Sequence, residues 1–490
     1  MSLSKISTLV KEISVNIPEV ATKQLKLRTC NGKRRVTLSS NWLVAFGFDG
    51  SKKVVETPLG EGKGISVRLA GKNDAKTKKV YSRTYKSRSA NPLNPVAGRK
   101  ERLIEISSQH HINFALGPEC MFVHITFRQG EVLFQPIIKE QYELLQRVDS
   151  NTKINTLVAM TGGVDCHALE SNNFSVDTVL SFRPQDKRDN SDYTEFDCMS
   201  VLVNSSPRVL VNEDIYQIIP ETLAELIGDT PITVGHFSLT CEEFSNLKNN
   251  KSKMKALEEL DSTVDMFIPM LNILKRIKFP VLVIENVEGF INSASNDILT
   301  LQLKRLGYKV SQGVFKANEL GGNSLRKRMY LIASTLDAPI DLPMPEKIES
   351  ANIWDNIILP HWDEIVEMDV TDTKVIKDAL STGRARIISE SKGFSPTLAR
   401  SQSQCPKDAV ICERSGRYYR LPVSVQKAIN NIPESFDLEW APLDKASQII
   451  GQSICYSMHD KIMKCVRKHI LNAAASLNEG LRMRQLAMGF

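Results

Sequence analysis

The sequence predicts an α/β protein whose doubly wound sheet follows a smaller, mostly β region. From Asn151 onward, apolar strand-like runs alternate with helical patterns, which is typical of a parallel sheet covered by helices. Two of these runs, residues 232–234 and 281–284, end where polar residues begin, and open α/β sheets carry their sites beyond the carboxyl ends of the strands. A last stretch, residues 454–471, is apolar at helical spacing, and we expect this helix to complete the sheet.

Composition indicates a soluble globular protein of two or three domains, because the chain has 490 residues, 42% of them hydrophobic and 24% charged. The N-terminus lacks a charged-then-apolar signal peptide and no apolar run approaches 18 residues, so we expect a cytoplasmic protein without a membrane span. The nine cysteines form no Cys-x-x-Cys pair, which favours reduced thiols over a disulfide framework or a zinc site. We therefore expect no metal.

The N-terminal region, residues 1–145, contains an internal repeat. Residues 35–69 and 102–137 both read as a strand, a short helix, a glycine turn and two further strands. This order resembles the AbrB-like swapped-hairpin units, which normally pair and are usually DNA-binding modules, so the two copies are expected to pair within the chain. A small β-barrel used only as a structural or dimerisation domain is the alternative.

The net charge of +7 is unevenly placed along the chain. Residues 71–103 carry ten Lys and Arg against two acidic residues, as expected of a segment that contacts a polyanion. A solvated linker would have a similar composition. Because this segment lies between the two repeats, we favour contact with DNA over a solvated linker.

Cys241 and Glu285 come after the two apolar runs that mark neighbouring strands. A thiol nucleophile and a carboxylic acid brought together in this way suit covalent catalysis followed by proton transfer. Residues 240–245, Thr-Cys-Glu-Glu-Phe-Ser, resemble the Pro-Cys-Gln-x-Phe-Ser loop of the DNA cytosine carbon-5 methyltransferases, and residues 285–287 are their Glu-Asn-Val. Counterparts of the family motifs occur in order over residues 155–470, so the resemblance implies a Rossmann-like, S-adenosylmethionine-dependent methyltransferase fold.

The resemblance also implies a chemistry. Cys241 would attack carbon 6 of a cytosine flipped out of the duplex, and Glu285 would face the ring nitrogen and the amino group. Arg326 and Arg328 hold the places of the family's Arg-x-Arg pair, which implies contacts with the cytosine carbonyl and a nearby phosphate. Glu242 stands where the family has Gln, and a negative charge beside a thiol disfavours the thiolate.

S-adenosylmethionine is the cofactor that the resemblance implies. The residues assigned to its binding are Val158, Thr161, Gly162, Gly163, Glu195, Asp214, Gln452 and Ser453. In the glycine turn, Met160 replaces the first glycine of the family's Phe-x-Gly-x-Gly-Gly motif. Glu195 is expected to close the second strand and hold the ribose hydroxyls, and Asp214 to lie near the adenine. Gln452 replaces the Asn of the family's Gly-Asn-Ser-Val motif.

The resemblance divides the rest of the chain into a catalytic domain, residues 151–335, a short target-recognition region, residues 336–393, and a return to the catalytic domain, residues 394–490. Duplex DNA in a prokaryotic or phage-infected cell is the expected partner, and a restriction endonuclease partner and the oligomeric state stay open. Two alternatives remain. The first is the same covalent activation on RNA or with another one-carbon group, and the second is a DNA-binding regulator with a relict catalytic domain.

Overall fold

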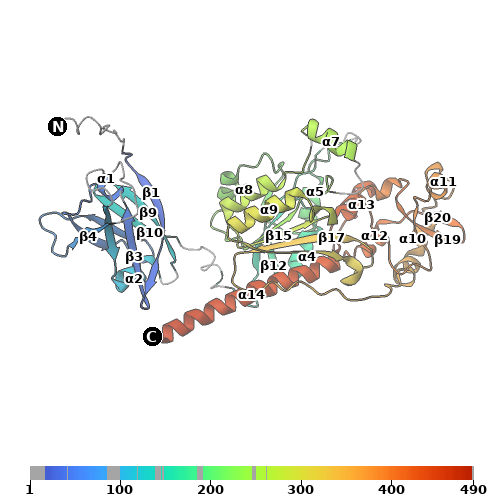
Figure 1. Cartoon of the computed structure of the whole chain (residues 1–490). Coiled ribbons are helices and arrows are strands. Elements are labelled where there is room, and N and C mark those ends of the chain that lie inside the picture. Colours follow the sequence, from blue (N-terminus) through green and yellow to red (C-terminus); the bar gives the residue numbers. More distant parts are fainter. Residues whose placement is uncertain are drawn as a thin grey trace. The chain divides into compact units, whose positions relative to one another are not determined.

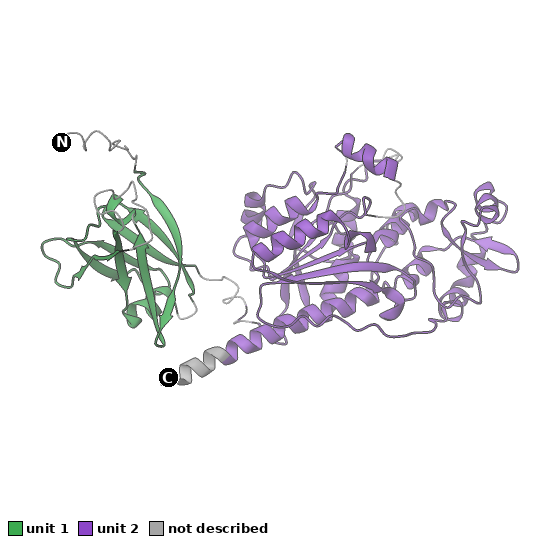
Figure 2. Cartoon of the chain, in the orientation of Figure 1, with its two compact units in different colours: residues 1–140 green, residues 141–490 purple. Residues whose placement is uncertain are grey.

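The computed structural model describes residues 17–40, 42–84, 100–117, 120–137, 145, 148–184, 191–244, 250–260 and 262–487, with the backbone alone for residues 480–487. Residues 85–99 of the expected basic segment lie outside the described residues. So do residues 185–190, which precede Glu195, and Ser245. The chain divides into two compact units, residues 1–140 and residues 141–490 (Figure 2). No described helix is long and apolar enough to cross a bilayer.

Unit 1 is built from strands and two short helices. Its elements are β1 (Ala21–Lys26), β2 (Arg28–Cys30), β3 (Lys33–Ser40), α1 (Trp42–Ala45), β4 (Lys53–Pro58), β5 (Ile65–Leu69), β6 (Lys78–Lys79), β7 (Tyr81–Thr84), β8 (Lys100–Ile106), α2 (Gln109–Leu116), β9 (Phe122–Arg128) and β10 (Glu131–Ile137). Six strands form one sheet in the order β1-β9-β10-β5-β4-β6, and four form a second in the order β2-β3-β8-β7.

The two sequence repeats have the same order of elements, β3-α1-β4-β5 and β8-α2-β9-β10. They also pair with each other, because β3 runs antiparallel to β8 and β5 runs antiparallel to β10. Alternate residues of these strands point into one core, for example Val36 and Leu38 of β3 and Ile125 and Phe127 of β9. This period of two is what an antiparallel sheet with one covered face requires.

Unit 2 is an α/β structure. Its strands are β11 (Ile154–Ala159), β12 (Phe174–Leu180), β13 (Val209–Val211), β14 (Val234–Ser238), β15 (Val281–Asn286), β16 (Lys309–Lys316), β17 (Lys327–Ser334), β18 (Arg386–Ile388), β19 (Val410–Arg414) and β20 (Arg417–Tyr419). Its α-helices are α4 (Val164–Ser171), α5 (Phe196–Asn204), α6 (Pro220–Ile227), α7 (Asn250–Glu258), α8 (Phe267–Ile277), α9 (Ala294–Arg305), α10 (Trp362–Val366), α11 (Lys374–Ser381), α12 (Val423–Ile429), α13 (Leu443–Gln452) and α14 (Tyr456–Ala487).

Seven strands form the main sheet of unit 2, in the order β13-β12-β11-β14-β15-β17-β16 (Figure 1). The first five are parallel, and β17 runs antiparallel to both β15 and β16. Residues of α4 and α14 form one core against one face of the sheet, and residues of α6, α8 and α9 form a second core against the other face. A parallel sheet covered on both faces needs apolar residues at successive positions, and β15 is buried along its whole length. This is the Rossmann-like methyltransferase architecture that the sequence predicted.

A smaller three-stranded sheet, β18-β19-β20, joins two regions that the sequence analysis assigned to different domains. The boundary expected at residue 393 runs through it, because β18 pairs in parallel with β19, which lies beyond that boundary. The closing helix also differs in its start. Residues 450–452 end α13, a turn comes next, and α14 begins at Tyr456 and continues to Ala487.

Candidate active site

The strand order of the main sheet reverses at β11, since β12 and β13 lie on one side of it and β14 and β15 on the other. Ligands of open α/β sheets bind beyond the carboxyl ends of the strands at such a switch point. The glycine turn leaves the sheet after β11, and the Cys241 loop leaves it after the neighbouring strand β14. The topology therefore brings the expected cofactor turn and the expected nucleophile to the same edge of the sheet.

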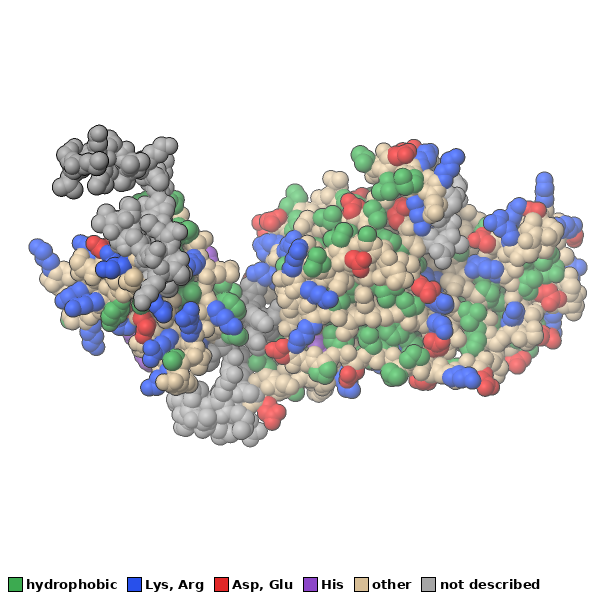
Figure 3. All heavy atoms as spheres, in the orientation of Figure 1, with side chains coloured by type: hydrophobic (Ala, Val, Ile, Leu, Met, Phe, Trp, Pro, Cys, Tyr) green, Lys and Arg blue, Asp and Glu red, His purple; other side chains and the backbone are tan. Residues whose placement is uncertain are grey.

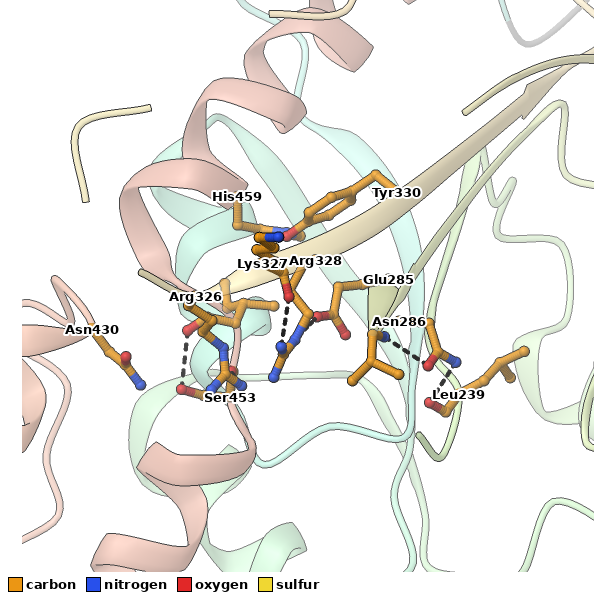
Figure 4. Close-up of polar contacts among 12 residues, drawn as sticks. Leu239, Glu285, Asn286, Arg326, Lys327, Arg328, Tyr330, Asn430, Ser453 and His459 are labelled. Atoms are coloured by element: carbon orange, nitrogen blue, oxygen red, sulfur yellow. Dashed lines mark hydrogen bonds and ion pairs between the residues drawn. The ribbon is translucent and has the colours of Figure 1, made fainter. Parts of the chain in front are cut away.

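The Cys241 loop is held by the last residue of β15 and by the segment that follows this strand. Nδ2 of Asn286 donates a hydrogen bond of 3.1 Å to the carbonyl oxygen of Leu239, just before the loop (Figure 4). Gly289 passes so close that a Cβ there would lie 2.2 Å from the carbonyl oxygen of Phe244. Only glycine tolerates that approach. The Glu-Asn-Val stretch thus positions the loop as well as supplying Glu285.

The Cys241 thiol lies among charges of both signs. Burial is the largest effect on it and raises its pKa. The guanidinium groups of Arg328 and Arg326 oppose this rise, since a positive charge favours the thiolate. The carboxylates of Glu285 and Glu242 add to the rise. The neutral thiol is therefore the resting form, and Arg328 is the strongest electrostatic influence towards the reactive thiolate.

Glu285 belongs to a row of three side chains, because Ser238, Glu285 and Tyr330 are paired across β14, β15 and β17. Its side chain is buried, and its Oε1 lies 2.8 Å from Nε of Arg328 in an ion pair (Figure 4). Oε1 has no hydrogen-bond partner within the described part of the chain, so the contact is electrostatic rather than a well-aligned hydrogen bond. The carboxyl group of Glu285 and the guanidinium group of Arg328 therefore lie side by side at the edge of the sheet where the Cys241 loop begins.

Arg326 differs from its expected role as a contact to the cytosine carbonyl or a phosphate. Its side chain is fully buried, and Nη1 and Nη2 donate to the backbone carbonyls of Leu398, Gly451 and Ser453. Arg326 and Ser453 lie next to each other in Figure 4. Burial lowers its pKa to about 9, and the neighbouring Arg328 adds to the decrease. Arg326 thus links the start of β17 by hydrogen bonds to Leu398 and to the end of α13.

The glycine turn after β11 has left-handed backbone at two positions. Met160, at the place of the first glycine, is left-handed with φ of 64°, and Gly163 has φ of 97°. Thr161 holds the turn, since its Oγ1 donates to Asp165 and accepts from the Gly163 amide at 2.8 Å, and its carbonyl accepts from Oγ of Ser181 at 2.7 Å. The turn therefore leads into α4 with its backbone fixed.

Val158 and Gly162 lie on either side of the start of this turn. The Val158 side chain is completely buried in the core, so only its backbone is available to a ligand. A Cβ on Gly162 would lie 3.5 Å from Cγ2 of Ile449, which places α13 against the turn. A helix that starts after such a turn favours polar or anionic groups at its amino end.

Glu195 does not close the second strand, in contrast to the expectation. β12 ends at Leu180, whereas Glu195 is exposed at the start of α5. Sequence reasoning did not single out Asp197, which lies two residues after Glu195 in the first turn of α5. Burial raises its pKa to about 6, and the nearby guanidinium groups of Arg183 and Arg400 oppose that rise. Residues 194–197 read Thr-Glu-Phe-Asp, and residues two apart at the start of a helix point to different sides, so Glu195 and Asp197 cannot serve in the same way.

The other expected cofactor residues are placed by local turns. Oδ1 of Asp214 accepts from the Tyr216 amide at 3.0 Å and so shapes the turn after β13. Gln452 is exposed at the end of α13. Oγ of Ser453 donates to the carbonyl of Ile450 at 2.8 Å. No group of three or more His, Cys, Asp or Glu side chains that could hold a metal occurs among the residues described.

Residues 211–382 match the family model of the C-5 cytosine-specific DNA methylases. This range contains Cys241, Glu285, Arg326 and Arg328, and it excludes the glycine turn. The Type II methyltransferase M.MspI of Moraxella sp is 32% identical over 135 residues, which are 27% of this chain and 29% of that relative. The chain thus spans less than a third of the length of this curated relative.

Two solved structures align with about two thirds of this chain. The Entamoeba histolytica methyltransferase EhMeth aligns with a TM-score of 0.50 and 15% identity, over 64% of this chain and 98% of that chain. The S. pombe Dnmt2 methyltransferase aligns with a TM-score of 0.49 and 15% identity, over 67% of this chain and 100% of that chain. At this identity, the similarity to EhMeth concerns the fold.

Proposed function

We propose that this protein transfers a methyl group from S-adenosylmethionine to carbon 5 of cytosine in DNA, because residues 211–382 match the family model of the C-5 cytosine-specific DNA methylases. The observation that carries the proposal is the arrangement at the switch point. A thiol comes after β14, and a buried carboxyl and guanidinium pair extends from β15 and β17 beside it. This set of groups suits attack on an electron-poor ring that is flipped out of its duplex.

In the proposed reaction, Sγ of Cys241 forms a bond to carbon 6 of the cytosine as its proton is lost to solvent. The electron pair of the 5,6 double bond then moves onto carbon 5 and the ring nitrogen, and Glu285, protonated from solvent as the base enters, donates a hydrogen bond to that nitrogen. S-adenosylmethionine supplies, when bound, an electrophilic methyl group for carbon 5. A base then removes the carbon-5 proton, the double bond re-forms, and the thiolate of Cys241 leaves.

Arg328 has two roles in this proposal. Its guanidinium lowers the pKa of the Cys241 thiol, which opposes the effect of burial. It also forms an ion pair with Glu285 at 2.8 Å, so that this carboxylate is not a lone buried charge before the base enters. Arg326 does not touch the substrate in this proposal, because its guanidinium is hydrogen-bonded to backbone carbonyls.

The residues around the glycine turn fit the proposed cofactor. The hydrogen bonds of the buried Thr161 with Asp165 and with the Gly163 amide fix the turn that would support the cofactor. Asp197 replaces Glu195 as the candidate carboxylate for the ribose hydroxyls. We retain Asp214, Gln452 and Ser453 as candidates on the basis of the motif alone.

Unit 1 is proposed to supply affinity for duplex DNA. Residues 1–140 contain 24 Lys and Arg against 11 Asp and Glu, whereas residues 141–490 contain 39 against 45. The net positive charge of the chain therefore comes from unit 1, and blue Lys and Arg side chains predominate over red acidic ones on its face in Figure 3. Basic surfaces of this kind bind phosphate backbones by releasing counterions. The proposed site of action is the cytoplasm of a prokaryotic or phage-infected cell, where DNA is accessible.

The proposal is tested by incubating the full-length protein with S-adenosylmethionine and either duplex DNA or RNA, followed by mass spectrometry of the nucleosides. The expected product is 5-methylcytosine in DNA, and Cys241→Ser should abolish it. Product in RNA alone, or a different mass added to cytosine, would replace the DNA methylation proposal with the first alternative. DNA binding without any S-adenosylmethionine binding would favour a relict regulator. Only methylation of a fixed short sequence would justify a search for a restriction endonuclease partner.

A further inference from the structure

Two buried histidines lie directly behind the row that contains Glu285. His236 lies on β14, two residues before Ser238, and therefore points to the same face of the sheet as Ser238 and Glu285. His459 lies on α14, which covers that face. The two rings pack edge to face, with centroids 4.9 Å apart and an interplanar angle of 89°. Both side chains are fully buried.

Polar contacts continue from this pair in both directions. Nδ1 of His459 lies 3.1 Å from Oη of Tyr330, in the same row as Glu285 (Figure 4). Nδ1 of His236 lies 3.5 Å from Oδ2 of Asp165, and the other carboxyl oxygen of Asp165 accepts from Thr161 in the glycine turn. A chain of buried polar side chains therefore extends from the glycine turn to β17.

Packing alone does not account for these two histidines. Burial lowers the pKa of His236 to about 4 and lowers that of His459 well below its usual value, so both rings are neutral at neutral pH. Neither nitrogen of His236, nor Nε2 of His459, makes a hydrogen bond within the part of the chain that the structure describes. Burying such groups costs free energy that an apolar side chain would avoid. Val234, the preceding residue on the same face of β14, is apolar, as packing requires.

We propose that His236 is a positioning residue which, together with His459, fixes the glycine turn relative to the strands that carry Glu285 and Arg328. This inference rests on the proposed function, since it concerns the same site. Catalytic groups must be held to within about 0.5 Å of their productive geometry. A misplacement of about 1 Å costs about a hundredfold in rate. The effect of the His236 side chain is transmitted through the Asp165 carboxyl, 3.5 Å from its Nδ1, and through the ring of His459 that packs against it.

The test compares full-length wild type with His236→Phe, which keeps an aromatic ring and removes both nitrogens. The rate constant kcat for methyl transfer should fall about tenfold to a hundredfold. The Kd for S-adenosylmethionine, measured by calorimetry, should rise, whereas the KM for DNA should change by less than about twofold. Without cofactor or DNA, the backbone amides of residues 160–166 should exchange hydrogen faster, because the turn opens more readily. His236→Asn restores one polar group and should recover part of each effect.

His469→Phe is the matched control. His469 is also buried on α14, but at the opposite end of β17, where its Nε2 lies 2.7 Å from Oγ of Ser334 and its Nδ1 lies 3.0 Å from the carbonyl of Pro339. This control should lower the melting temperature and leave kcat, cofactor affinity and exchange at residues 160–166 unchanged. Tyr330→Phe, which removes the other end of the path, should act in the same direction as His236→Phe and serves if that variant does not fold.

Unchanged kcat and unchanged exchange at residues 160–166 in His236→Phe would overturn the inference. Equal effects of His236→Phe and His469→Phe would also overturn it, since they would reveal a general loss of packing. A wild-type protein that neither binds S-adenosylmethionine nor transfers a methyl group would instead refute the proposed function. The exchange measurement separates the two failures because it requires neither cofactor nor activity.

Discussion

Replacing Arg326 by Met should unfold unit 2 at a lower temperature rather than remove a contact to DNA. The guanidinium of Arg326 satisfies the carbonyls of Leu398, Gly451 and Ser453, which lie 72, 125 and 127 residues further along the chain. Each orphaned buried acceptor costs about 1–3 kcal/mol. Part of that loss is offset because a positive charge is no longer buried, so we expect a net loss of about 3–5 kcal/mol in the free energy of unfolding.

The size of the temperature shift depends on the size of unit 2, residues 141–490. An unfolding entropy of about 2.1 cal/mol/K per residue gives about 0.7 kcal/mol/K for this unit, so the melting temperature should fall by about 4–7 °C. Differential scanning calorimetry of the full-length protein measures it. Arg328→Met is the comparison, because it should abolish methyl transfer with a smaller shift. An Arg326→Met protein with wild-type melting temperature and weakened DNA binding would refute this reasoning and restore Arg326 as a substrate contact.

Three further predictions concern the carboxylates and unit 1. Glu285→Gln should lower the rate of methyl transfer about a hundredfold in single-turnover measurements, because one stabilising group in the transition state is lost, and near-normal turnover would make Glu285 structural. Burial raises the pKa of Asp165 from 3.8 to about 6, so the folded state binds this proton more tightly and loses about 3 kcal/mol of stability as the pH rises from about 4 through 6. Urea unfolding of Asp165→Asn should therefore show a smaller loss over that range, and an identical pH dependence would contradict the assignment. Removal of residues 1–140 should flatten the slope of log affinity for DNA against log salt by several units, at about 0.9 per phosphate contact, while an unchanged slope would indicate that unit 1 serves another purpose.

The sequence was sufficient to place a residue in the fold where its motif coincides with the end of a strand. Cys241 and Glu285 could be located because each comes at the end of an apolar run, and parallel strands bring the residues at their carboxyl ends to one edge of the sheet. The glycine turn was predictable for a similar reason, since Gly163 has to adopt a positive φ at the start of α4. These features depend on residues close together in the chain.

The features that the sequence did not reveal depend on distant segments. Arg326 has the spacing of a substrate ligand, but its guanidinium is satisfied by carbonyls more than 70 residues away. Glu195 was chosen for its position after a strand, whereas the start of α5 exposes it and places Asp197 beside Arg183. His236 reads as one polar residue in an apolar strand, and only α14 brings His459 against it.

The formation of a covalent bond between Cys241 and cytosine is the central claim, and trapping with modified DNA tests it most directly. Full-length protein is incubated with S-adenosylmethionine and duplex DNA that contains 5-fluorocytosine, because fluorine at carbon 5 cannot be removed as a proton after methyl transfer. We expect a denaturation-resistant protein–DNA adduct that maps by mass spectrometry to the peptide containing Cys241. We expect none with Cys241→Ser, although that variant should still bind DNA. An adduct of undiminished yield in Cys241→Ser, or one that maps to Cys166 or Cys198, would contradict the account.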